Sequence, residues 1–304
     1  SWIAGAYPWG TPSPAQLYNG IWLAVALGVI HNTDILADQA LTRFAPLVRD
    51  KVKELEDIRY RMTTMPARTV FWLYAFFFLV LLASAIQDPS FVTVEQLDGP
   101  LPTLPLAINV FWGAASYSMA TVMVYHAVRQ LNLVTKAYDL VDRVDIFHQQ
   151  PLYAFSGLAM RTALFFVAQV YITYTLEPLF DPSASTEIIN LTLSSVVVFL
   201  SFAIVLLPLW GIHQRISAAK SDALEENSMQ IAETRGSLYE ALRAKEFALA
   251  GQVEGGLGSL FRERDLLKTI PTWPWEAGAF RNFLSAILLP MLLWLLQSLA
   301  ERFF

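Results

Sequence analysis

Long runs of hydrophobic residues separate shorter polar segments along most of the chain. The run from Val70 to Gln87 contains eighteen residues without a charge and lies between Arg68 and Asp88. A helix that is apolar on every side lies either in a membrane or in the centre of a large protein. A membrane span needs about 20 largely apolar residues, and this run is close to that length. The same pattern predicts four clear spans, at 69–87, 106–127, 153–176 and 188–211.

Two more segments come close to the length of a span. Residues 282–299 are just long enough, and Pro290 would kink a helix there. Residues 15–31 are borderline, and they either cross the membrane or lie in its interface. The fold class that we predict is all-α: a polytopic membrane helix bundle of five or six spans, in a single integral membrane domain over residues 1–304.

Apolar residues also recur at helical spacing in three of the polar segments. In the last of them Leu224, Ile231 and Leu238 are seven residues apart, a spacing typical of helix pairing in a coiled coil. The glycine-rich segment 251–258 is expected to break that helix. We expect helices at about 38–58, 128–146 and 213–250, which extend the spans into a cytoplasmic helical bundle.

Composition agrees with a membrane protein. The 304 residues are 55% hydrophobic and 15% charged, whereas soluble domains average about 25% charged residues. The absence of cysteine excludes disulfides, thiolate metal sites and cysteine nucleophiles. A net charge of -5 without a strongly basic patch argues against nucleic acid as a partner. The first thirty residues lack a basic segment followed by an apolar one, so we expect no signal peptide.

The 21 lysines and arginines are unevenly distributed. None occurs in residues 1–42, 88–105 or 177–187, and most lie in 43–68, 129–143 and 215–268. Cytoplasmic loops of membrane proteins carry the excess of lysine and arginine. We therefore expect an integral protein of the cell or inner membrane with its basic loops in the cytoplasm. Six spans would put both termini outside, and five would put the N-terminus inside.

The interiors of the predicted spans contain no Asp, Glu, Lys or His, and Arg161 is the charged residue that lies inside one of them. Proton-coupled carriers, voltage sensors and intramembrane metalloproteases need such groups, so these classes are disfavoured. Soluble-enzyme motifs such as GxGxxG, the P-loop, HExxH and GxSxG do not occur either. We expect no enzyme activity, no cofactor and no metal site.

Weakly polar side chains form stripes along three of the spans, because residues at i, i+4, i+7 and i+11 share one face of a helix. Such stripes line ion pathways in some channels. In other membrane proteins the same residue types hydrogen-bond between helices and hold them together. The candidate pore-lining residues are Asn109, Ser116, Thr162, Gln169, Thr173, Asn190, Ser194 and Ser201.

Arg161 lies about two turns inside the predicted span 153–176. Its long side chain can reach the cytoplasmic surface, as arginines near span ends do. It can also pair with Asp142 or Asp145, or bind an anion at the inner mouth of a pore.

Three histidines, His31, His126 and His213, each lie at the predicted cytoplasmic end of a span. If they converged they would form a metal site or a sensor of pH near neutrality. The alternative is three independent interfacial positions.

The predicted function is an oligomeric, channel-like membrane protein with a weakly polar, uncharged path between its central spans. The alternative is a non-conducting sensor or scaffold subunit whose cytoplasmic helices dock a partner. The expected partners are the lipid bilayer, other copies of the chain and a cytoplasmic protein.

Overall fold

The computed structural model describes residues 9–10, 14–87, 103–180, 188–275 and 278–288. Within these ranges the chain is helical and contains no strands, which confirms the predicted all-α class. The principal helices are α1 (Pro14–Phe44), α2 (Val52–Thr63), α3 (Ala67–Gln87), α4 (Thr103–Asp139), α5 (Ser156–Phe180), α6 (Ile188–Arg243) and α7 (Phe247–Thr269).

Four helical stretches of the described chain are long and apolar enough to cross a membrane. They are Gln16–Gln87, Leu106–Asp139, Gln150–Ala168 and Phe199–Arg243, and the first of them contains both α1 and α3. The predicted span 282–299 is helical as far as residue 288, and its remainder lies outside the described residues. Five or six spans therefore stay a prediction.

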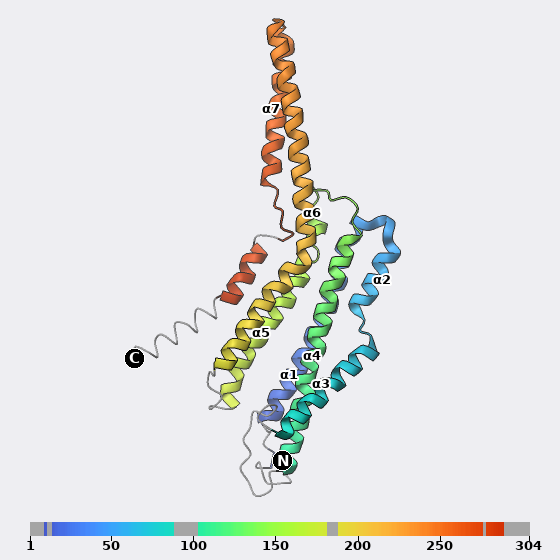
Figure 1. Ribbon diagram of the computed structural model, residues 1–304, viewed down its shortest axis with the longest axis vertical. Helices are drawn as coiled ribbons and strands as arrows, with labels where there is room; N and C mark the ends of the chain where they lie inside the picture. The colour runs from blue at the N-terminus through green and yellow to red at the C-terminus, as the bar shows by residue number, and fades with distance from the viewer. Residues whose placement is uncertain (1–8, 11–13, 88–102, 181–187, 276–277, 289–304) are drawn as a thin grey trace, which may run out of the picture.

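The helices form a bundle in which α1, α4, α5 and α6 pack together (Figure 1). Helix α3 packs against α4 on the outside of this bundle. Its free side exposes large apolar residues, among them Trp72 and Phe76. Apolar side chains that face outward along a 21-residue helix are typical of contact with lipid tails.

A short linking helix separates α1 from α2, where the sequence predicts one helix over 38–58. The 3-10 helix η1 (Ala45–Lys51) begins with Pro46 in its first turn and has a non-helical backbone at Val48. Proline is tolerated at a helix start but not in a helix interior, so α1 ends just before it. The chain then folds back, and Leu55 and Met62 of α2 are buried against the bundle.

The end of the bundle near η1, here called the stalk end, holds an aromatic core. Phe44 of α1, Tyr138 of α4 and Phe155 are fully buried, with ring centroids 5.1 to 5.6 Å apart. The Tyr138 hydroxyl donates to the Leu152 carbonyl of η3 (Gln150–Tyr153) at 2.8 Å. Helix α4 stops at Asp139, earlier than the predicted helix over 128–146, and this core fixes the turn that follows.

A two-helix hairpin, here called the stalk, projects from that end of the bundle (Figure 1). It consists of the last part of α6 and the whole of α7, which run antiparallel. The turn lies at residues 244–246, where Lys245 has a positive φ of 59°. The glycine-rich segment 251–258 does not break a helix, contrary to the sequence prediction, and it lies within α7. Glycine costs only about 1 kcal/mol in a helix, a cost that contacts with α6 offset.

Stacked aromatic rings join the stalk to the last described helix, residues 278–288. Trp273 stacks on the imidazole of His213 with the ring centroids 3.9 Å apart, and on Trp275 with the centroids 4.4 Å apart. Trp275 stacks in turn on Phe280, at a centroid distance of 4.6 Å. His213 Nδ1 lies 3.0 Å from the Thr272 carbonyl. These contacts hold the segment that follows α7 against α6.

Candidate functional site: the seam between α1 and α4

Buried polar side chains follow the line along which α1 packs on α4. Both helices lead toward the stalk end (Figure 1), so residues near the start of α1 meet residues near the start of α4. We call this line the α1–α4 seam. Its polar members are Gln16, Asn19, Trp22 and Asp34 of α1, and Asn109, Ser116, His126 and Gln130 of α4.

The first polar cluster of the seam lies far from the stalk. Gln16 Nε2 donates to Asn109 Oδ1 at 3.4 Å, and Ser116 Oγ donates to the Asn19 carbonyl at 3.2 Å. The Asn19 amide and the Trp22 indole N–H are buried and have no hydrogen-bond partner among the described residues. Buried polar atoms without a partner are rare and often mark bound water or a functional site.

The second polar cluster lies toward the stalk end and contains ionisable groups. His126 Nε2 is 2.8 Å from Asp34 Oδ1, and Gln130 Nε2 donates to the same oxygen at 3.0 Å. The His126 side chain is 1% exposed, whereas that of Asp34 is 24% exposed. A buried imidazole thus contacts a carboxylate that is partly exposed to solvent. We call these three residues the Asp34–His126 cluster.

The same turn of α4 also holds the link between α2 and α3. Gln130 Nε2 donates to the Met62 carbonyl at 3.0 Å, and the Arg129 guanidinium donates to the Thr64 carbonyl. Because α2 ends at Thr63, these carbonyls have no helical partner of their own. The cluster therefore fixes three helices relative to one another.

An apolar layer separates the two polar clusters. Ala26 and Ile30 of α1 pack against Val122 and Met123 of α4, and all four are buried. The seam is consequently polar at both ends and closed by hydrocarbon between them.

The structure brings some of the predicted pore-lining residues to the seam and leaves others elsewhere. Asn109 and Ser116 belong to the seam and contact α1. Thr162 of α5 and Ser201 of α6 are buried, and the Thr162 hydroxyl has no partner in the described part of the chain. The other predicted side chains lie outside the described residues: Gln169, Thr173, Asn190 and Ser194.

Arg161 and the three histidines occupy separate environments. Arg161 is exposed on α5. Of its two suggested partners, Asp142 pairs with Lys51 at 2.7 Å, and Asp145 accepts a hydrogen bond from the Phe147 N–H at 2.9 Å. His31 is exposed, so the histidines do not converge on a common site. The described residues contain no cluster of three or more His, Cys, Asp or Glu that would hold a metal ion.

Sequence reasoning missed the part that α1 plays in the seam. Its borderline hydropathy left open whether residues 15–31 span the membrane or lie in its interface, whereas α1 packs against both α4 and α5. The available signal was the regular spacing of its buried residues across the boundary between the predicted segments 15–31 and 38–58. These residues are Tyr18, Trp22, Ala26, Ile30, Thr33, Ala37, Leu41 and Phe44.

A second connection joins α4 to the stalk helix, and we call it the α4–α6 junction. Arg215 of α6 donates through Nη1 to the carbonyls of Tyr138 and Val141, at 2.7 and 3.2 Å. Its Nη2 donates to Asp139 Oδ1 at 2.8 Å. One guanidinium thus satisfies carbonyls at the end of α4 and attaches that end to α6.

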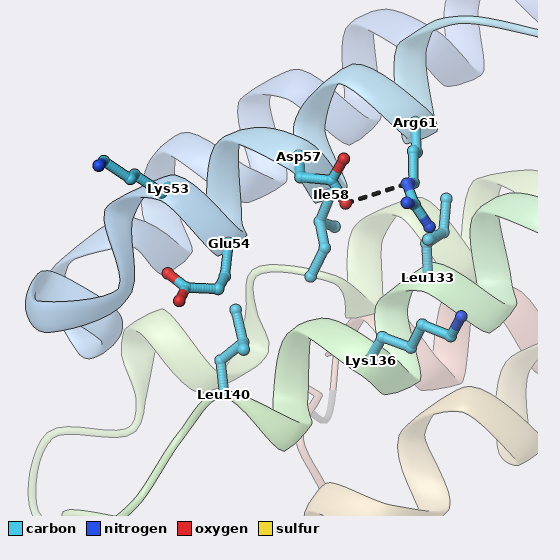
Figure 2. Close-up of a pocket in the computed structure, with 8 residues that line it drawn as sticks. All are labelled: Lys53, Glu54, Asp57, Ile58, Arg61, Leu133, Lys136 and Leu140. Atoms are coloured by element: carbon cyan, nitrogen blue, oxygen red, sulfur yellow. Dashed lines mark ion pairs between the residues drawn. The ribbon is translucent and has the colours of Figure 1, made fainter.

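A groove of about 390 Å³ lies between α2 and α4. Ile58 and Leu133 line it together with charged residues of both signs, and Arg61 pairs with Asp57 at 2.9 Å (Figure 2). Three cations, Lys53, Arg61 and Lys136, stand against the carboxylates of Glu54 and Asp57. With its charges nearly balanced, the groove lacks the strong field of one sign that binds a charged ligand.

Comparison with protein families, with curated proteins and with solved structures finds no match for this chain. Its function is therefore argued from the geometry of the seam, the junction and the stalk.

Proposed function

We propose that this protein is a non-conducting membrane relay, in which a helical bundle in the bilayer carries a self-associating stalk in the cytoplasm. The observation that supports this most is the continuity of α6. It is a single helix of 56 residues, whereas a span requires about 20. The remaining residues extend the same helix well beyond the bilayer.

The two parts of α6 have different surroundings. Val205, Leu209, Ile212 and Ile216 are completely buried in the main hydrophobic core of the bundle. Beyond Ser221 most side chains are exposed, and this part of the helix runs beside α7 (Figure 1). Because a helix is stiff, a movement of its buried part is transmitted to the stalk.

The charge distribution supports a cytoplasmic stalk. Lysines and arginines recur through residues 215–268, and none occurs in residues 1–42. The positive-inside rule then assigns the stalk end of the bundle to the cytoplasmic face.

The outward face of α7 is the surface through which we propose that two copies pair. Ala248, Gly251, Gly255 and Ser259 follow one another at i, i+3, i+7 and i+11 and are all exposed. A Cβ atom added at either glycine would meet nothing within 4 Å. Two glycines in a helix cost about 2 kcal/mol relative to alanine, yet nothing among the described residues uses the space. Phe247, Phe261 and Leu266 expose apolar surface on the same helix.

Charge favours a second copy as the occupant of this face. Two copies in one membrane, with their stalks on the same side, bring each residue near its own counterpart. Charged residues at such a contact would repel each other, and the four residues of the α7 face carry no charge. The outward face of α6 is acidic, with Glu225, Glu233 and Glu240 exposed, and is unsuited to pairing with itself.

Cysteine cross-linking tests the pairing, because the chain contains no cysteine of its own. With Ser259→Cys in proteoliposomes we expect a disulfide-linked dimer under mild oxidation, since paired helices bring these Cβ atoms close. Ala232→Cys on the outward face of α6 is the matched control and should stay monomeric. Equal cross-linking of the two variants, or none with Ser259→Cys, would contradict the proposed contact.

An ion-conducting function is the second candidate, and the unpartnered polar atoms of Asn19 and Trp22 favour it. Ion flux in sealed liposomes separates the two functions. We expect the liposomes to remain impermeable to K⁺ and Cl⁻ across voltage and pH, because the apolar layer closes the seam. Flux that Asn109→Leu removes while the protein stays folded would establish the channel and reject the relay. Thr121→Leu on the same helix is the control.

A further inference from the structure

We propose that the Asp34–His126 cluster is a proton-binding site and that its occupancy sets the conformation of the relay. The inference rests on the proposed function for what the site regulates, but the site itself is argued from its own geometry. A proton from water adds to the imidazole of His126 and returns to water when it leaves. Histidine is the side chain that ordinarily changes charge between pH 5 and 8.

The surroundings of His126 make the electrostatic balance of the Asp34–His126 cluster depend on the charge of the ring. The ring is 1% exposed, and its Nε2 lies 2.8 Å from a carboxylate oxygen. Its other nitrogen, Nδ1, has no hydrogen-bond partner among the described residues, so it is not committed to another group. A protonated ring compensates the charge of Asp34, and a neutral ring leaves that charge without a counterion in a partly buried position.

Protons have a route to the ring. The Asp34 side chain is 24% exposed and touches the imidazole directly. A carboxylate in this position exchanges protons with solvent and passes them to the ring over a single hydrogen bond. No opening of the bundle is required for the site to fill or empty.

Neighbouring charged groups on the elements around His126 are engaged elsewhere or exposed. On its own helix, Arg129 donates to the Thr64 carbonyl. On α1 and α2, Asp38 pairs with Arg59 at 3.2 Å, and Arg61 pairs with Asp57. Further titratable or charged groups on these helices are the exposed His31 of α1, Arg68 of α3 and Arg161 of α5, the half-buried Tyr125 of α4, and Tyr74 of α3, whose hydroxyl donates to the Ala115 carbonyl. Asp34 is therefore the counterion of His126.

A change of charge at this cluster acts on the link between α2 and α3. The Gln130 amide donates both to Asp34 and to the Met62 carbonyl. A movement of the Asp34 carboxylate therefore changes the hydrogen bond between this amide and the link from α2 to α3. When the ring loses its positive charge, its Nε2–H still donates to Asp34, but the carboxylate no longer has a counterion and attracts the N–H groups of the Gln130 amide more strongly. The bond to Met62 is then weakened.

Helix α4, which carries His126, leads to the α4–α6 junction. Helix α4 ends at Asp139, where Arg215 of the α4–α6 junction holds the carbonyl of Tyr138. A shift of α4 that begins at His126 therefore reaches α6 through this guanidinium. Protonation of one buried ring is thereby connected to the position of the stalk.

Amide hydrogen exchange of the full chain in lipid nanodiscs, read by mass spectrometry between pH 5 and 8, tests the proposal. After correction for the intrinsic pH dependence of exchange, we expect peptides covering 60–68 to exchange several-fold faster at pH 8 than at pH 5. The change should disappear in His126→Gln and, independently, in Asp34→Asn. His31→Gln, exposed on α1 one turn from Asp34, is the control and should behave as wild type.

Each outcome bears on the proposal. Corrected exchange of 60–68 that is independent of pH in the wild type would overturn it, as would a change that persists in both cluster variants. If the link responds and peptides of α6 around Arg215 do not, the proton site stands and the proposed relay falls. If both respond together and both become insensitive in Asp34→Asn, the site and the relay are supported.

Discussion

Replacing Phe155 by alanine is expected to lower the free energy of unfolding by about 3 to 5 kcal/mol, the range found for large-to-small changes at buried aromatic positions. The ring is fully buried between Phe44 and Tyr138, at centroid distances of 5.1 and 5.3 Å. Its removal leaves a cavity where α1, α4 and α5 meet. Thermal or denaturant unfolding of the purified protein in detergent measures the loss.

Phe147 provides the matched control for this substitution. It lies eight residues earlier in the chain but is 66% exposed. Phe147→Ala should change stability little, because its ring loses few contacts on removal. A similar loss in both variants would mean that the aromatic core at the stalk end does not stabilise the bundle.

Arg215→Met is expected to cost about 2 kcal/mol, since three hydrogen bonds to a charged donor are lost and two backbone carbonyls lose a partner. Methionine keeps much of the length and apolar surface of the arginine stem. The loss should appear both in unfolding and as faster hydrogen exchange in residues 136–141. The second readout places the effect at the α4–α6 junction.

Two further variants separate geometry from charge at the junction. Arg215→Lys keeps the positive charge but lacks the forked guanidinium, so it should recover only part of the stability. Arg235→Met removes an exposed arginine from the stalk portion of the same helix and should leave both readouts unchanged. If Arg215→Met also leaves exchange in residues 136–141 unchanged, the guanidinium does not hold the end of α4.

Helical class and apolar length are readable from the sequence because both depend on local pattern. The uncharged run that became α3 needs no tertiary information to be recognised as membrane-like. The predicted helix boundaries are wrong where contacts between residues far apart in the chain determine where a helix ends. The turn at Lys245 is set by the antiparallel packing of α7 on α6, and this packing outweighs the glycines at 251–258.

The candidate site was only partly predictable for the same reason. Asn109 and Ser116 were identified from their spacing on one helix face, but their partner helix was not, because the polar residues of α1 lower its hydropathy. The polar residues that made the segment 15–31 borderline as a span are among those that join α1 to α4. Asp34 and His126 are 92 positions apart in the chain, so no local pattern relates them.

Pro208 lies inside α6, within the part of the helix that packs in the bundle. Proline removes one backbone hydrogen bond and bends a helix at a defined point. The helix from Pro208 to Arg243 extends about 52 Å at a rise of about 1.5 Å per residue, and it behaves as a lever arm. A change of about 10° in the direction of the helix at Pro208 would displace the tip of the stalk by about 9 Å, close to the interaxial distance of two packed helices. A rearrangement too small to open the bundle is thus large enough to bring two tips into contact or to part them.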